Sequence, residues 1–364
     1  MASVEHKFPC VSCGADLRFQ PGTTALVCDH CGVENALPEE TGRDHLEELD
    51  FAAALAEREA GGEVEETRFS KCENCGAEIE YDEQIHATEC AFCAAPLVTD
   101  TGTHRRIKPA ALLPFRKSEK EVRAAMTKWL GRLWFAPNGL QDYAKKGRAM
   151  TGIYVPFWTY DADTKSKYRG QRGTIYYETR MVQVEEDGKT VTREEQVQKI
   201  RWTPARGRVA RFFDDILVVA SKSLPRDYID ALEPWDLEAL EPYRPDYLAG
   251  FQAEGYTIPL ETGYREARDH MDRVIDSDVR RDIGGDRQQV EHVETVISDV
   301  TFKHILLPVW MAAYSFRGKT YRFVVNARSG QVRGERPWSW VKITFAVITA
   351  IVVIAILVLL FGEG

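Results

Sequence analysis

Four C-x-x-C pairs near the N-terminus constrain the fold of this chain more than any other feature. All eight cysteines fall into two sets with the same spacing: Cys10, Cys13, Cys28 and Cys31, then Cys72, Cys75, Cys90 and Cys93. In each set, fourteen residues separate the two pairs. Two thiolates three positions apart fit one tight knuckle, and a second knuckle completes a tetrahedral Cys₄ site. The spacing predicts two zinc ribbons, in residues 1–37 and 68–99, each with one Zn²⁺.

The expected role of both ions is structural. Four thiolates leave no open coordination position, and a ribbon of this size cannot fold without its metal. A rubredoxin-like iron or an iron–sulfur cluster remains an alternative, because thiolates also bind iron. His30 and His86 lie nearby but exceed the four ligands needed. Because every cysteine belongs to a metal-type pair, we expect a reducing compartment and no disulfide.

The second strong feature is a hydrophobic segment at the other end of the chain. Residues 343–361 read ITFAVITAIVVIAILVLLF, without a charge. A helix of this length crosses about 30 Å of hydrocarbon, so the segment predicts one transmembrane helix. The alternative, a buried core helix, fits less well because the run is apolar on all faces.

The flanks of this segment predict its orientation. Arg333, Arg336 and Lys342 lie just before the span, whereas no basic residue follows it. The positive-inside rule therefore places the N-terminal body in the cytoplasm, beneath the cell membrane. Trp338 and Trp340 occupy the positions of interfacial anchors. No secretory signal is recognisable before the first cysteine pair.

An acidic linker, residues 38–67, separates the two ribbons. Leu46, Leu49, Ala53 and Leu55 have the spacing of one helical stripe, which Gly61 and Gly62 end. The stripe can pack on a ribbon or on the main body, which we favour, or it can bind a partner.

The main body, residues 105–335, is predicted to be α+β with mostly antiparallel pairing. Ser118 and Glu121 form a capping box that opens a helix. From Gly152 onward the apolar period changes to two, and residues 175–184 and 190–202 form a hairpin across Asp187-Gly188. The remaining expected elements are an extended pair at 208–213 and 216–220, helices at 225–232 and 260–283, strands at 290–302, 304–316 and 320–325, and a turn at 327–330.

One short pattern occurs twice within this body. Residues 153–158 and 305–310 share I-x-[VL]-P-[FV]-W. The pattern suggests a duplicated half-domain, in which Trp158 and Trp310 fill equivalent core positions and each proline marks an edge or a bulge. Two unrelated strands with the same residues remain the alternative, since six positions are few.

Charge and motifs argue against enzyme and nucleic-acid functions. The net charge is −9, and residues 67–100 carry two basic against seven acidic side chains, a balance that phosphate disfavours. The two Gly-Lys-Thr segments lack the earlier glycine of a phosphate-binding loop, and no G-x-S-x-G, H-E-x-x-H or G-x-G-x-x-G element is present. We therefore expect no enzyme and no nucleic-acid partner.

Taken together, the cysteine knuckles, the L-P-F segment at 113–115, the two Pro-Trp strands and the C-terminal span resemble a bacterial family of membrane-anchored double zinc-ribbon proteins. Its members are often labelled primosomal-protein-N′-like or helicase-like, and some look to be encoded beside phage-shock A or flotillin-like proteins. The missing ATPase motifs contradict the helicase label here. The resemblance implies an envelope-associated adaptor, with only the eight cysteines carried over as site residues.

Three functional hypotheses follow. The first is a tail-anchored, zinc-binding adaptor that recruits protein partners at the cytoplasmic face of the cell membrane, in envelope-stress or membrane-organisation complexes. The second is a membrane-tethered nucleic-acid-binding protein that uses ribbon aromatics such as Phe19 and Phe92. The third is an enzyme with an unrecognised site in the body.

Overall fold

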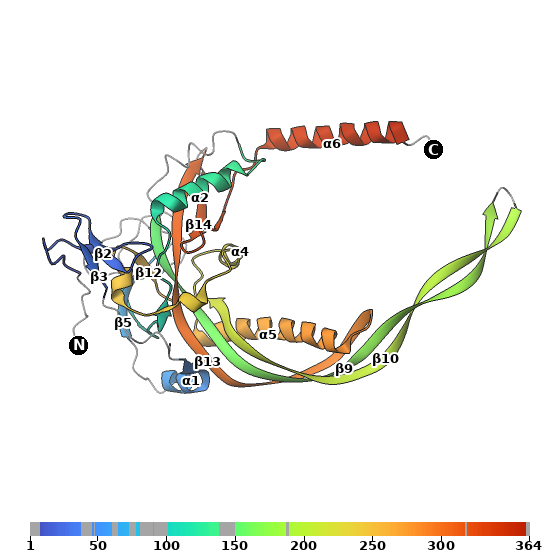
Figure 1. The fold of residues 1–364 in the computed structure, drawn as a ribbon, viewed down its shortest axis with the longest axis horizontal. Helices are drawn as coiled ribbons and strands as arrows, with labels where there is room; N and C mark the ends of the chain where they lie inside the picture. Colours follow the sequence, from blue (N-terminus) through green and yellow to red (C-terminus); the bar gives the residue numbers. More distant parts are fainter. Residues whose placement is uncertain are drawn as a thin grey trace.

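Three long strands, β9 (Thr151–Glu186), β10 (Lys189–Val219) and β13 (Arg287–Phe316), organise the body of the protein. The computed structural model describes residues 8–37, 46, 48–59, 65–72, 78–80, 90, 101–137, 150–186, 189–316 and 319–361. Strand β9 lies between β10 and β13 and is antiparallel to both. Figure 1 shows these strands leaving the core as a long curved ribbon.

Shorter elements complete two sheets. A small sheet holds β1 (Leu17–Phe19), β2 (Ala25–Cys28) and β3 (Glu34–Ala36). The main sheet has the order β11-β8-β13-β9-β12-β6-β5-β7, with β10, β14, β15 and β4 paired at its sides. Its further strands are β4 (Leu49–Asp50), β5 (Glu65–Lys71), β6 (Glu78–Glu80), β7 (Thr101–Arg106), β8 (Ala111–Leu112), β11 (Glu241–Pro242), β12 (Gln252–Glu254), β14 (Lys319–Asn326) and β15 (Val332–Gly334).

Helices cover this sheet and extend from it. They are α1 (Phe51–Glu59), α2 (Glu119–Gly131), α4 (Arg226–Asp230), α5 (Leu260–Ile283), α6 (Trp340–Phe361) and the 3₁₀ turns η1 (Leu237–Ala239) and η2 (Pro245–Leu248). Among the described strand pairs, β8 with β13 and β12 with β9 are parallel, and the others are antiparallel. The predicted α+β class with mostly antiparallel pairing is confirmed.

The two copies of the repeated pattern pair with each other at the centre of this sheet. Strand β9 meets β13 in a register that sets Val155, the third position of the first copy, opposite Leu307, the third position of the second. The pairing is therefore symmetric about this point. Each copy also has a short parallel neighbour at its first two positions, because β12 pairs with residues 153–154 and β8 with residues 305–306.

The symmetry extends to the two core tryptophans. The indole N–H of Trp310 donates to the carbonyl of Lys117 at 2.8 Å, and that of Trp158 donates to the carbonyl of Ile258 at 3.0 Å. Lys117 precedes the N-cap of α2, and Ile258 precedes the N-cap of α5. Both tryptophans are buried and occupy equivalent positions, as the duplicated pattern predicts.

The prolines of the pattern lie in interior strands, at breaks in the outer ladder. The carbonyl of Pro156 accepts from the N–H of Ala220 at 2.9 Å, and that of Pro308 accepts from Ala327 at 3.1 Å. A residue's N–H and C=O point to the same side of a strand. Each proline nitrogen therefore points to the outer side of its strand, at the position where one neighbouring strand ends and the next begins. No strand that the structure describes pairs with the proline on that side, so no ladder hydrogen bond is lost.

Each half thus runs from a short strand through a helix into a long strand and its hairpin partner. The first half uses β8, α2, β9 and β10, and the second uses β12, α5, β13 and β14. The halves differ in that α5 has 24 residues against 13 in α2, and the first hairpin is far longer. We call residues 162–186 of β9, 189–213 of β10 and 287–299 of β13 the arm. Helix α5 lies along the inner side of the arm (Figure 1).

Two predicted breaks in the strands are wrong. Residues 208–213 and 216–219 lie in one strand, β10, rather than in an extended pair, and residues 290–302 and 304–316 both belong to β13. Asp214 and Asp215 look like a turn in the sequence but form a bulge opposite Asp161. A second bulge follows Ser298 in β13. Asp215 and Asp299 both have positive φ, which accommodates the bend at the base of the arm.

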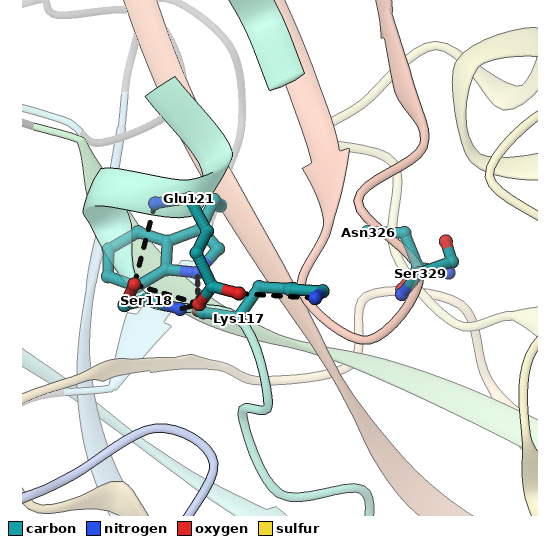
Figure 2. Close-up of polar contacts among 6 residues, drawn as sticks. Lys117, Ser118, Glu121, Asn326 and Ser329 are labelled. Atoms are coloured by element: carbon teal, nitrogen blue, oxygen red, sulfur yellow. Dashed lines mark hydrogen bonds and ion pairs between the residues drawn. The ribbon is translucent and has the colours of Figure 1, made fainter. Parts of the chain in front are cut away.

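The predicted starts of α2 and α5 are correct. Ser118 accepts from the N–H of Glu121, whose carboxylate accepts in return from the N–H of Ser118 at 2.9 Å (Figure 2). Val122, Met126 and Leu130 form the buried face of α2. Helix α5 occupies residues 260–283 as predicted, and Gly263 lets it approach the sheet, since a Cβ there would lie 2.6 Å from the Tyr160 hydroxyl.

The linker helix is shorter than predicted and packs on the body. Helix α1 begins at Phe51, because Leu49 and Asp50 pair with β13 as strand β4. Phe51, Ala54 and Leu55 pack against the hydrophobic cluster that contains the buried face of α5, whereas Ala53 is exposed. Of the two alternatives for this stripe, packing on the body is the one observed.

Candidate metal centre and membrane helix

The four cysteines of the first predicted site converge. Their Sγ atoms all lie within 4.8 Å of one another, and Cys10 with Cys31 and Cys13 with Cys28 are each separated by 3.5 Å. Sulfurs bound to a tetrahedral Zn²⁺ at about 2.3 Å lie about 3.8 Å apart. Residues Cys10, Cys13, Cys28 and Cys31 can therefore hold one metal ion.

The two knuckles have the same backbone geometry. The N–H of Gly14 donates to the carbonyl of Cys10, and that of Gly32 donates to Cys28, both at 2.9 Å. Both glycines have φ of +74°, and a Cβ at either would meet no atom within 4 Å. Glycine is therefore favoured here for its left-handed backbone rather than for space.

Backbone groups in the knuckles favour thiolates. Hydrogen bonds from the backbone at Ser12 and Cys13 lower the pKa of Cys10 to about 7. A hydrogen bond from the backbone of Cys31 lowers the pKa of Cys28 in the same way. Hydrogen bonding with the Cys28 thiol, together with burial, raises the pKa of Cys13 instead. Thiolate is the form that binds metal, so the backbone prepares Cys10 and Cys28 for this role before an ion arrives.

The second cysteine set is described in part. Cys72 and Cys90 are buried in one core cluster with residues such as Leu113 and Ile305. Cys75 and Cys93, and His86, lie outside the described residues. The hairpin strand β6 of this region joins the main sheet, because Ala253 and Glu254 of β12 pair with Glu80 and Ile79.

The first ribbon is packed against the body through Phe19. This ring is fully buried and lies 5.2 Å from Tyr247 and 6.5 Å from Phe251, centroid to centroid. The N–H of Phe19 also donates to the carbonyl of Ala249 at 3.0 Å. The suggestion that Phe19 stacks on nucleic acid is therefore wrong, since its ring belongs to the core; Phe92 lies outside the described residues.

Helix α6 has the properties of a membrane span. An 18-residue window from Trp340 to Leu357 is apolar enough to cross a bilayer, and none of it is buried against the protein. A core helix of a water-soluble protein would be mostly covered, so that alternative does not apply. The predicted span, residues 343–361, begins one turn inside α6.

The arm carries a basic stripe that the sequence analysis missed. Five exposed cations lie on the face opposite α5: Lys165, Lys167, Arg169, Arg206 and Arg208. In the described residues none of the five forms an ion pair. Arg208 lies directly opposite Lys167, and Arg206 opposite Arg169, pairs of like charge that are unfavourable. Glu294 of β13 lies opposite Lys167 on its other side and offsets part of this cost. The sequence signal that could have shown the stripe is the recurrence of Lys or Arg at every second position, at 165, 167 and 169 and at 206 and 208.

A buried charge network lies at the base of the arm. The ammonium of Lys303 contacts Glu48 at 2.9 Å and Asp215 at 2.8 Å. Asp161 accepts a hydrogen bond from the N–H of Asp215 at 2.7 Å. Burial raises the pKa of Asp161 to about 7, and the nearby Glu48 contributes in the same direction. Burial also acts to raise the pKa of Glu48, but hydrogen bonds from Thr301 and Lys303 outweigh it and lower that pKa.

Asp161→Asn should flatten the pH dependence of stability between about pH 4 and pH 7. The folded-state pKa of Asp161 lies above its ordinary 3.8, so its contribution is complete below pH 4 and lost as the pH rises through about 7. The loss has an upper limit of about 4 kcal/mol. Asparagine keeps an acceptor for Asp215 but cannot ionise. Thermal unfolding of both proteins in detergent at pH 5 and pH 8 checks this, and an unchanged difference between the two pH values would contradict it.

Comparison with known proteins adds one relative. No family model matches the chain, and no solved structure does. The chain is similar to "Uncharacterized protein YdjG" of Bacillus subtilis (strain 168), with 27% identity over 339 residues. The aligned region covers 92% of this chain and 91% of the relative. The similarity therefore extends over nearly the whole of both proteins.

Proposed function

We propose that this protein is a tail-anchored, zinc-binding membrane adaptor that recruits protein partners at the cytoplasmic face of the cell membrane. The observation that carries the proposal is α6, an apolar helix at the end of the chain with no protein surface covering it. The basic residues before it, Arg333, Arg336 and Lys342, favour a cytoplasmic body. An anchor of this kind raises the effective concentration of membrane-bound partners.

Zinc serves a structural role in this proposal. The sulfur geometry of the first site suits tetrahedral Zn²⁺, and the equal spacing of the second set supports a second ion. The eight cysteines are then fully used as ligands. The protein acts through its surfaces and is not an enzyme.

The arm supplies the surface for a partner. Beyond Gly173, β9 and β10 continue without β13 as a two-stranded hairpin. Such a hairpin is marginally stable alone, and here it exposes Tyr177 and Met181 by 64% and 65%. By resemblance, the partners are phage-shock A-like or flotillin-like proteins.

The basic stripe of the arm favours a second candidate, a membrane-tethered nucleic-acid-binding protein. Here the stripe, rather than the acidic ribbons, would contact phosphate. The net charge of −9 opposes this candidate. A binding constant for a single-stranded oligonucleotide that falls steeply with salt, and that is lost in the double variant Arg206→Glu, Arg208→Glu, would favour it over the adaptor.

Cross-linking in native membranes tests the adaptor. The full chain is expected to capture the same few membrane-bound proteins in every preparation. A chain ending after Arg336 should move to the soluble fraction and lose them, because only the anchor has been removed. A full chain that stays in the soluble fraction, or that captures only chaperones, would refute the proposal.

A further inference from the structure

An exposed aromatic loop lies beside the start of α6. Residues 132–137, which follow α2, include Trp134 with 82% of its surface exposed and Phe135 with 37%. Tryptophan is usually well buried in folded proteins. Trp338 and Trp340, also exposed, come from the other end of the chain. We call Trp134, Phe135, Trp338 and Trp340 the aromatic patch.

Hydrogen bonds join the two segments of the patch. The N–H of Ser339 donates to the carbonyl of Phe135 at 2.7 Å. The ammonium of Lys342 donates to the carbonyls of Ala136 at 2.8 Å and Trp134 at 3.2 Å. The loop therefore lies where α6 begins, although the two segments are about 200 residues apart in the chain.

The body holds this loop in place. Ala136 is buried, and its N–H donates to the carbonyl of Leu133 at 3.0 Å. The preceding helix α2 is packed through Met126 and Leu130. Trp134 is thus presented on a fixed element, and its exposure is a property of the fold.

Basic residues flank the patch along the chain. Lys128 and Arg132 are exposed at the end of α2, and the guanidinium of Arg336 lies over the Trp338 ring, 4.2 Å from its centroid. Tryptophan with neighbouring lysine and arginine is typical of the membrane–water interface, where indole lies among headgroups and cations meet anionic lipid. In a chain of net charge −9, this local composition points to a lipid surface.

The hydrogen bond of Ser339 does not depend on the tilt of α6, whereas those of Lys342, in the first turn of the helix, do. Helix α6 and the arm point in the same general direction (Figure 1), so a bilayer normal to α6 in that orientation would meet the arm. A spanning α6 must therefore swing relative to the body. Ser339 precedes the first residue of the helix, so its hydrogen bond to Phe135 lies at the pivot and keeps the loop at the point of membrane entry.

We propose that the loop 132–137 inserts Trp134 into the headgroup layer of the bilayer that α6 spans. This inference rests on the proposed anchor and adds a second point of lipid contact, from the folded body. Two contacts far apart in the chain restrict rotation of the body about α6. The arm then projects from the membrane in one preferred orientation.

Quenching of tryptophan emission by brominated lipid tests the inference. The full chain is reconstituted in vesicles of phosphatidylcholine and phosphatidylglycerol, with or without bromine on the acyl chains near the headgroup. Trp134→Ala should reduce the emission that brominated lipid quenches, because Trp134 contributes to it. The matched control, Trp202→Phe on the arm, should leave the quenchable emission unchanged.

Two outcomes separate failure of this inference from failure of the anchor. Flotation of the full chain with the vesicles, and loss of quenchable emission in Trp340→Phe, report on α6 alone. Flotation with no effect of Trp134→Ala would overturn the loop contact and leave the anchor standing. Absence of flotation would overturn both. Far-UV circular dichroism confirms that each variant is folded.

Discussion

Cys28→Ser should remove one metal ion per chain and unfold the first ribbon. Cys28 is buried, and its Sγ lies 3.5 Å from that of Cys13. Structural Zn²⁺ contributes about 10–16 kcal/mol in small ribbons, more than a sheet of three short strands can replace. Because Phe19 of this sheet packs on Tyr247, unfolding should also expose the adjacent body. Metal analysis by mass spectrometry and limited proteolysis measure both effects.

His30→Ala is the matched control for this variant. His30 is exposed and follows Cys28 by two positions, yet it is not needed as a ligand. The His30→Ala protein should keep both its full metal content and its protease resistance. A full metal content in Cys28→Ser would show that the four cysteines do not form the site. Detection of iron in place of zinc would correct the metal while leaving the ligand set intact.

Trp158→Ala should lower the free energy of unfolding of the body by about 3–5 kcal/mol. The ring is fully buried, 6.0 Å from Phe302 and 4.9 Å from Tyr256 between centroids, so truncation leaves a large cavity. The indole also satisfies the carbonyl of Ile258. Trp158→Phe keeps most of the volume and should cost about 1–3 kcal/mol, mainly from that unpaired carbonyl. Denaturant unfolding in detergent, followed by circular dichroism, measures both.

The equivalent positions of Trp158 and Trp310 predict similar losses of stability when either is truncated. Trp310 occupies the equivalent place, with its indole bonded to the carbonyl of Lys117, so Trp310→Ala should cost a similar amount. Trp134→Ala removes the same side chain from an exposed site and should change stability in detergent by less than about 0.5 kcal/mol. A loss at Trp310 no larger than that at Trp134 would show that the halves are not energetically equivalent.

Local patterns predicted the features that depend on neighbours in the chain. The Ser118–Glu121 capping box and the α5 boundaries at residues 260–283 each follow from a few adjacent residues. The convergence of Cys10, Cys13, Cys28 and Cys31 follows from metal geometry. The six-residue pattern predicted equivalent tryptophans, although only the strand register could show that the two copies pair with each other.

Features that depend on distant contacts were not predictable. The bulge at Asp214 and Asp215 was not predictable, because acidic pairs are frequent in turns and the network with Lys303 is not visible in the sequence. The contact between Lys303 and Glu48 joins residues 255 positions apart. The exposure of Trp134 was not predictable either, since its neighbours in the chain do not show that the start of α6 lies beside it.

The hairpin at the end of the arm has a consequence for the spacing between a partner and the body. Beyond Gly173 each strand continues for about 13 residues, or about 43 Å at 3.3 Å per residue. A protein captured at this tip would be kept tens of ångströms from the end of β13. The chain would then act as a ruler, setting the distance between whatever it holds and its own folded body.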